Sequence, residues 1–163
     1  MKFIILFNLI IKICICSFIP NANHVIFKEQ VSYHNLLEIY QLPCHSQSAR
    51  IKSFKSSIYK MNQLQITNLY DIHDLIAFRY VFYDSDDLFK FYHHMKLEKT
   101  ILYTKNYISK PKDNGYSALH IRYINDYDIC PIKLIECQLY LIDDYYNAIY
   151  GKAKYNKNYT DVY

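Results

Sequence analysis

Two acidic side chains lie where a carboxylate could do chemistry. Asp74 comes directly before a run of apolar and aromatic residues at 75–83, and Glu136 interrupts a second apolar run. A carboxylate in such a position is costly unless a partner compensates its charge. A hard cation would do so at either position, and for Glu136 so would a substrate hydroxyl or an ordinary salt bridge to Arg50 or Lys52. For Asp74, capping of the preceding turn is a further alternative.

A basic segment at residues 50–61, with the sequence RIKSFKSSIYKM, precedes the first carboxylate. Ser56 and Lys60 are one helical turn apart, so they share a face of the expected helix. A hydroxyl and an ammonium on one face suit a joint grip on phosphate oxygens. Taken alone, the segment fits a solvated basic helix equally well.

A second group of polar residues surrounds the turn at Asn114-Gly115, and this glycine is one of only two in the chain. Asn-Gly is a strong turn signal, so a plain hairpin turn is one interpretation. Cations around an open loop suit phosphates, and a tyrosine at its edge suits stacking on a base. The residues concerned are Lys105, Lys110, Lys112, Tyr116, His120 and Arg122.

The elements that position these groups follow from hydrophobic periodicity. The pattern predicts an α/β (α+β) fold, in which a mixed β-sheet of four or five strands is flanked by helices. Helices are expected at 27–40, 53–61, 84–97 and 140–151. An extended entry is expected at 49–52, and strands at 75–83, within 100–107, at 117–124 and at 132–139.

Composition limits the class of protein. The 163 residues are 52% hydrophobic and 21% charged, which fits one folded domain, expected at 28–155, with a polar tail at 156–163. A net charge of +4 suits a pocket for polyphosphate nucleotides better than a broad nucleic-acid surface. The five cysteines have neither metal-binding spacing nor an even number, so free thiols are expected.

The N-terminus, residues 1–23, starts with Met-Lys and continues as an apolar run interrupted by Lys12. This resembles a signal or targeting segment, and the alternative is an apolar helix packed on the domain. The run is short for a membrane span, so none is expected. Location is therefore expected to be cytoplasmic, or organellar or secretory if the segment is a targeting signal.

Four blocks together resemble the synthetase domain of the RelA/SpoT family. The first is RIKSFKSSIYKM, the second is DLIAFR at 74–79, and the fourth is ECQ at 136–138. The third is the loop, which is similar to the family's D-Y-I-x-x-P-K-x-N-G-Y-x-S-x-H motif. It matches at Tyr107, Ile108, Pro111, Lys112, Asn114, Gly115, Tyr116 and His120. The resemblance covers residues 50 to about 155 and implies a nucleotidyltransferase-like fold.

The resemblance implies transfer of pyrophosphate from ATP to the 3′-hydroxyl of GDP or GTP, giving (p)ppGpp. It implies that Asp74 and Glu136 are catalytic and bind Mg²⁺. The implied ATP-binding residues are Arg50, Lys52, Ser56, Lys60 and Arg79. The implied acceptor-binding residues are Lys110, Lys112, Asn114, Tyr116, His120 and Gln138, with Tyr116 stacking on guanine.

Several positions depart from the family pattern. Tyr103 and Tyr140 stand where arginines are expected, Ile149 where a glutamate is expected, and Asn106 where an aspartate is expected. Two alternatives therefore stay open: a toxin-like small synthetase acting on adenosine nucleotides or the tRNA 3′ end, and a nucleotide-binding module without turnover. A third, a metal phosphohydrolase using the His73-Asp74 pair, would need further ligands. The sequence is compatible with a homo-oligomer and predicts no other stable nucleic-acid partner.

Overall fold

A five-stranded mixed sheet forms the centre of the computed structural model, which describes residues 19–151. The strands are β1 (Cys44–Ile51), β2 (Ile76–Phe82), β3 (Ile101–Asn106), β4 (Leu119–Ile124) and β5 (Leu134–Leu141). The helices are α2 (Ala22–Ile39), α3 (Phe54–Leu64), α4 (Ser85–Glu98) and α5 (Ile142–Tyr150), with a 3₁₀ turn η1 at Leu69–Asp71. The predicted fold class is confirmed.

The strand order is β1-β2-β5-β4-β3. The central pair, β2 and β5, is parallel, whereas β1 with β2, β5 with β4 and β4 with β3 are antiparallel. The sheet therefore brings together two strands that are more than fifty residues apart in the sequence. These are the strands that follow Asp74 and contain Glu136.

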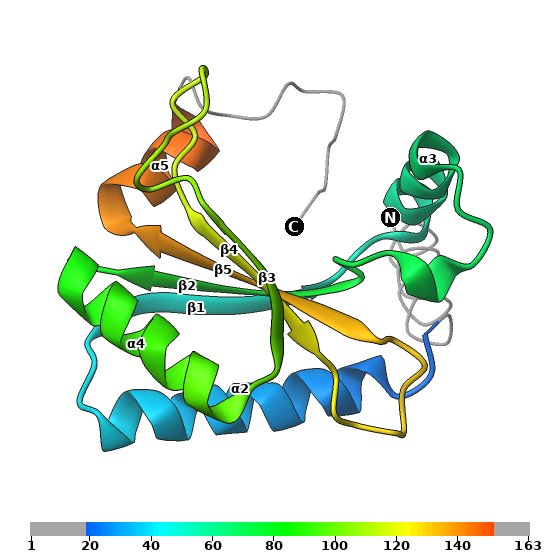
Figure 1. The fold of residues 1–163 in the computed structure, drawn as a ribbon, viewed down its shortest axis with the longest axis horizontal. Coiled ribbons are helices and arrows are strands. Elements are labelled where there is room, and N and C mark those ends of the chain that lie inside the picture. The colour runs from blue at the N-terminus through cyan, green and yellow to red at the C-terminus, as the bar shows by residue number, and fades with distance from the viewer. Residues whose placement is uncertain (1–18, 152–163) are drawn as a thin grey trace, which may run out of the picture.

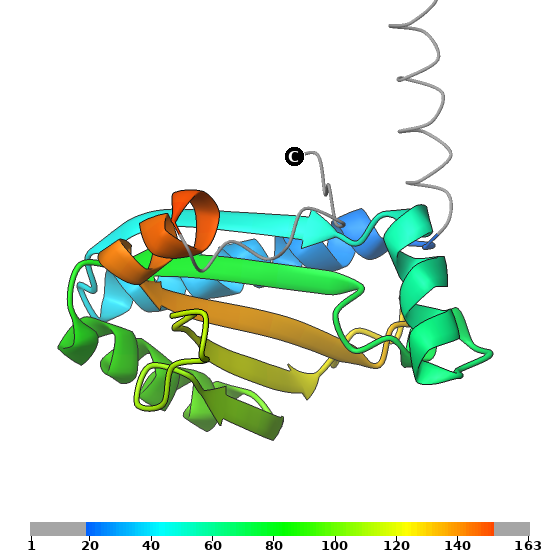
Figure 2. The same cartoon turned by 90° about the horizontal axis from the view of Figure 1, so that it is seen from above.

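The two faces of the sheet are covered differently. Helices α2 and α4 pack along one face, where the main hydrophobic core forms (Figure 1). Helices α5 and α3 lie toward opposite ends on the other side of the sheet (Figure 2). The middle of this second face is therefore left to side chains of the strands themselves.

Strand alternation sorts side chains between the faces. The core face takes aromatic and aliphatic residues from the central strands, including Phe78, Tyr80, Ile121, Cys137 and Leu139. The opposite face takes the residues between them, which are largely polar. Both central strands lie among other strands, so even this second face is substantially buried.

Side-chain caps fix the starts of two helices, α3 and α4. The Ser53 hydroxyl accepts a hydrogen bond from the Ser56 amide at 3.2 Å, and an Asp84 carboxylate oxygen accepts from the Asp87 amide at 2.9 Å. These contacts satisfy amide groups that have no partner within the helix. The starts of α3 and α4 are therefore fixed by local sequence.

Four expectations were wrong in detail. Helix α2 begins at Ala22 rather than 27, and strand β1 begins at Cys44 rather than 49. Tyr140 lies in β5, not in the following helix. Helix α3 ends at Leu64 rather than at 61.

The apolar N-terminal segment predicted at 1–23 and the polar tail at 156–163 fall largely or wholly outside the described residues. Of the first, Ile19 and Ala22 are buried in the core. No helix between residues 19 and 151 is both long and apolar enough to span a membrane.

A buried ion pair joins helix α2 to Lys99, the residue that ends helix α4. The Lys99 ammonium lies 2.8 Å from a carboxylate oxygen of Glu29, which is 1% exposed. The other oxygen of Glu29 accepts a hydrogen bond from the Tyr123 hydroxyl at 2.8 Å. The ammonium also lies about 6 Å from the rings of Tyr33, Tyr123 and Tyr127. This cluster locks α2, the end of α4 and β4 together.

Replacing Lys99 with methionine is expected to cost about 3–5 kcal/mol of unfolding free energy, because it leaves the Glu29 charge buried without a counter-ion. Urea unfolding measures this. The matched control is Lys90→Met, which removes an exposed ion pair with Asp87 and should cost less than ~1 kcal/mol. Equal losses in the two variants would show that the buried pair does not matter for stability.

Candidate functional site

The polar side chains of the second face are aligned in rows across the strands. In the first row Arg50 pairs with Ala77, Ala77 with Glu136, and Glu136 with Arg122. The next row, displaced by two residues, contains Ser48, Arg79, Gln138, His120 and Lys105. Residues from four separate predicted blocks therefore meet on one surface because of strand register.

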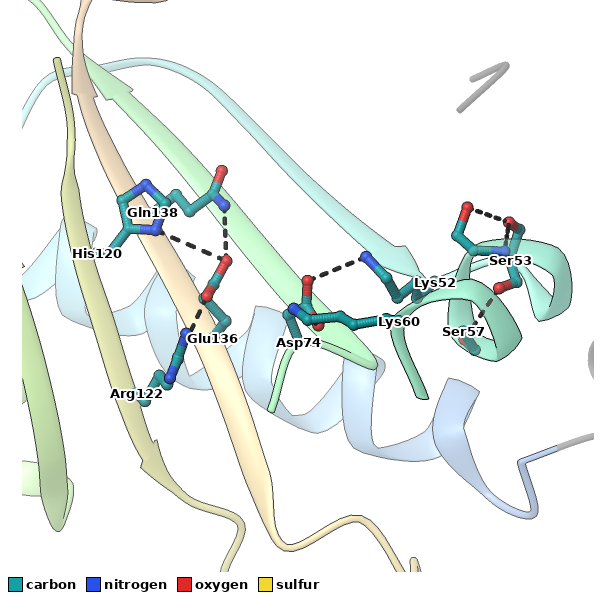
Figure 3. A network of polar contacts seen from close by, with 10 residues as sticks. Lys52, Ser53, Ser57, Lys60, Asp74, His120, Arg122, Glu136 and Gln138 are labelled. Atoms are coloured by element: carbon teal, nitrogen blue, oxygen red, sulfur yellow. Dashed lines mark hydrogen bonds and ion pairs between the residues drawn. The ribbon is translucent and has the colours of Figure 1, made fainter. Parts of the chain in front are cut away.

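Asp74 lies at the start of this surface, just before β2, and is 7% exposed. One carboxylate oxygen is 3.0 Å from the Lys52 ammonium and the other is 2.7 Å from that of Lys60 (Figure 3). Burial alone would raise the pKa of Asp74, but the two ammonium groups lower it to about 2. The carboxylate is therefore ionised and held between β1 and α3.

Glu136 is 5% exposed and has a different set of partners. The Gln138 amide donates to its Oε1 at 2.7 Å, Arg122 Nε is 3.5 Å from its Oε2, and His120 Nδ1 is 3.9 Å from Oε1 (Figure 3). The Arg122 contact is an ion pair from the neighbouring strand β4, where Arg122 lies opposite Glu136 in the register. Burial lowers the pKa of His120, which favours a neutral imidazole beside the carboxylate.

The loop between β3 and β4 is longer than a two-residue hairpin turn and is ordered by its own hydrogen bonds. Asn106 Oδ1 accepts from the amides of Ile108 and Ser109 at 2.9 and 3.0 Å. This is a role that the family's aspartate would serve as well, since either side chain offers such an acceptor oxygen. Farther along, Gly115 has φ +79° and its amide donates to the Lys112 carbonyl at 2.8 Å.

Helix α5 holds this loop in place. Asn147 Nδ2 donates to the Gly115 carbonyl at 3.3 Å, and the Ser117 hydroxyl donates to Asp144 at 2.6 Å. Asn114 caps the turn, because its Oδ1 accepts from the Tyr116 amide at 3.2 Å. The loop is therefore fixed relative to the end of β5.

Tyr116 is only 7% exposed. Its hydroxyl lies 2.7 Å from His120 Nε2 and 2.6 Å from the Tyr140 hydroxyl. The Lys112 ammonium lies over its ring at 4.9 Å and over that of Tyr107 at 4.7 Å. The predicted stacking role of Tyr116 stays a prediction, and a base would have to displace Lys112 from that face.

The residues predicted to bind ATP lie on both sides of Asp74. The Arg79 guanidinium is 5.5 Å from the ring of Tyr140 and 5.6 Å from that of Tyr145, so it is held toward α5. Arg50 lies across the same face on β1, and Ser56 is tied to Ser53 by a 2.8 Å contact between hydroxyls. Lys110 is exposed at the loop.

Sequence reasoning missed the parts that Arg122 and Tyr140 play. The sequence places Arg122 among the cations around the loop and does not indicate that it pairs with Glu136. Tyr140 was placed in a helix, although Glu136, Gln138 and Tyr140 alternate as residues of one strand face should. Continuing that alternation by two residues would have found it.

Residues 49–159 match the family model described as a region found in RelA/SpoT proteins, which is more than half of the chain. The chain belongs to the RelA/SpoT family. Guanosine-3′,5′-bis(diphosphate) 3′-pyrophosphohydrolase of Spiroplasma citri is 38% identical to this chain over 79 residues. That match covers 47% of this chain and 10% of the relative, so the chain spans only a small part of that relative's length.

Solved structures of alarmone synthetases share the fold of this RelA/SpoT domain. Small alarmone synthetase 2 from Bacillus subtilis has a TM-score of 0.68 and 22% identity, over 77% of this chain and 71% of that one. A GTP pyrophosphokinase family protein from Streptococcus pneumoniae has a TM-score of 0.69 and 21% identity, over 79% and 70%. Identities this low establish the shared fold and no more.

The donor set of this RelA/SpoT site fits Mg²⁺ delivered with a nucleotide. Mg²⁺ is usually held by one or two carboxylates together with phosphates and water, and the face offers Asp74 and Glu136. Within residues 19–151 no group of three or more His, Cys, Asp or Glu residues could hold a metal by itself.

The loop geometry leads to a prediction at Gly115. An added Cβ would meet only Asn147 Nδ2 at 3.5 Å, an ordinary contact, so the cost of substitution comes from the backbone. Gly115→Ala should cost about 1–2 kcal/mol in chemical unfolding. Gly115→Asn should cost less, because asparagine tolerates positive φ better. An asparagine variant no more stable than the alanine variant would contradict this account.

Proposed function

We propose that this RelA/SpoT protein transfers pyrophosphate from ATP to the 3′-hydroxyl of GDP or GTP, forming (p)ppGpp and AMP. Family membership supports an enzyme of (p)ppGpp metabolism. The observation that carries the finer proposal is the placement of two buried, charge-compensated carboxylates on one polar sheet face. The basic α3 block lies on one side of them and the basic loop on the other.

The donor side is built from Lys52 and Lys60. Both ammonium groups now neutralise Asp74, and both are the kind of group that binds triphosphate oxygens. Entry of ATP would give these lysines additional anionic partners without removing them from the carboxylate. Arg50 and Arg79 lie in adjacent rows of the same face and are proposed to hold adenine, and Ser56 to contact phosphate.

The acceptor side is built from the loop and β4. Tyr116 is proposed to carry the guanine base once Lys112 has moved from its ring, and Lys110 and Lys112 to bind the acceptor's phosphates. Asn114 shapes the turn, while His120 and Gln138 lie between the loop and Glu136. The acceptor hydroxyl would thus be directed toward Glu136.

The reaction forms a bond between the acceptor 3′-oxygen and the β-phosphorus of ATP. It breaks the bond between that phosphorus and the oxygen that bridges to the α-phosphate. The bridging oxygen leaves with AMP. Glu136 would accept the hydroxyl proton, since its carboxylate is fixed by Gln138 and Arg122. Mg²⁺ held by Asp74 and Glu136 would neutralise charge on the donor phosphates. Lys52 and Lys60 would share that neutralisation, which is the main catalytic task in phosphoryl transfer.

The proposal predicts a 3′-pyrophosphorylated guanosine nucleotide when the protein is incubated with labelled ATP, GDP or GTP, and Mg²⁺. Asp74→Ala should lower the rate by about 10²–10³, because it removes a charge that organises the donor phosphates. The matched control is Asp71→Ala. Asp71 is exposed, and its carboxylate lies 3.9 Å from the Lys133 ammonium. An Asp74→Ala rate equal to that of the control would refute the mechanism.

A second candidate, a nucleotide-binding module without turnover, is favoured by the loss of family polar groups at Tyr103, Tyr140 and Ile149. The Arg122 guanidinium lies over the ring of Tyr103 at 5.1 Å, so this tyrosine contacts the arginine that pairs with Glu136. Calorimetry distinguishes the two candidates. Nucleotide binding with no product formed would support the module and reject the synthetase.

A further inference from the structure

Five side chains on the polar face, Glu136 among them, form a ring of contacts. Gln138 donates to Glu136 at 2.7 Å, and the Tyr140 hydroxyl donates to Gln138 Oε1 at 3.2 Å. Beyond Tyr140, contacts of 2.6 and 2.7 Å lead through the Tyr116 hydroxyl to His120 Nε2. His120 Nδ1, 3.9 Å from Glu136 Oε1, closes the ring.

The chemistry of these groups fixes the order of the protons. An ionised carboxylate only accepts, so Gln138 must present its amide N–H to Glu136 and its carbonyl oxygen to Tyr140. Tyr140 spends its single proton on that oxygen, so it must accept from Tyr116. Tyr116 has then spent its own proton and must accept from His120 Nε2–H.

This order leaves the neutral His120 with a bare Nδ1. A neutral imidazole carries one N–H, and here it is committed to Tyr116. Nδ1 and Glu136 Oε1 therefore present two acceptors, 3.9 Å apart, to the same space. Such a pair suits an incoming hydroxyl, which can donate to either atom.

We propose that Tyr140 is a positioning residue that sets this proton order, and thereby holds Gln138 against Glu136 and His120 as its Nε2–H tautomer. The inference rests on the proposed function for its catalytic consequence, because the aligned acceptors face the site expected for the acceptor hydroxyl. The ring itself depends only on the protein.

Tyrosine at this position differs in kind from the arginine of the family pattern. A guanidinium has five donors and no acceptor, so it could donate to Gln138 but could not accept from Tyr116. With arginine there, the Tyr116 hydroxyl would have to direct its proton elsewhere, and the order of protons at His120 would no longer follow. Tyrosine in place of arginine therefore changes the direction of the hydrogen bonds in the ring as well as removing a charge.

Nitrogen-15 NMR of the histidine rings tests the ring without substrate. At about pH 8, where imidazole is neutral, ring nitrogens with and without a proton have separate shifts. The signal of His120 among the seven histidines is assigned by its loss in His120→Gln. We expect the Nε2–H tautomer in the wild-type chain and a mixture of tautomers in Tyr140→Phe, which keeps the ring packed on Arg79.

The matched control is Tyr145→Phe, which removes the hydroxyl of the other tyrosine beside Arg79 but leaves the five-membered ring of contacts intact. Its His120 shifts should equal those of the wild-type chain. An Nδ1–H tautomer in the wild-type chain, unchanged shifts in Tyr140→Phe, or equal changes in both variants would overturn the proposal. Matching thermal unfolding midpoints establish that both variants are folded.

Kinetics provide the second readout. Tyr140→Phe should lower kcat about tenfold, the scale of one or two lost hydrogen bonds, and leave KM for the acceptor within about twofold. A rise in KM with unchanged kcat would overturn the positioning role. If the wild-type chain forms no product, the proposed function fails, and the NMR result still decides whether Tyr140 orders the ring.

Discussion

The parallel pairing of β2 with β5 is the constraint on which the rest of the structure depends. Asp74 precedes one of these strands and Glu136 lies within the other, and the register places Ala77 beside Glu136. A shift of one residue would turn Glu136 into the apolar core and Cys137 out of it. Burial of Phe78, Cys137 and their neighbours therefore also fixes where the carboxylates lie.

Because the carboxylates are buried, the surrounding positive charges are a structural requirement as well as a functional resource. Lys52 and Lys60 compensate Asp74, and Arg122 compensates Glu136. The strands and α3 must hold these cations close to maintain the fold. A polyanionic nucleotide would thus meet positive groups that are already ordered, and little conformational entropy would be lost in arranging them.

The sequence predicted the features that depend on local pattern or residue type. Strand alternation, the helix starts near Ser53 and Asp84, and the basic segment with Lys52 and Lys60 belong to this class, as does the position of Asp74 before an apolar strand. It did not predict pairing partners, because which strand lies beside Glu136 depends on the whole sheet. Hence Arg122 was overlooked as its partner, and Tyr140 was assigned to the wrong element. The sequence also predicted too short an extended segment for β1, because a polar strand at the edge of a sheet has no continuous apolar run to mark it.

The position of Lys112 over Tyr116 has a consequence for selectivity. If Tyr116 stacks on a base as proposed, the base exchanges one cation–π contact of this ring for one stacking contact, so the net gain from the base is small. An anion near the displaced ammonium would compensate for the contact that the ammonium loses. A phosphorylated purine supplies that anion and a free base or nucleoside does not. The loop would therefore discriminate by what is attached to the base as well as by the base itself.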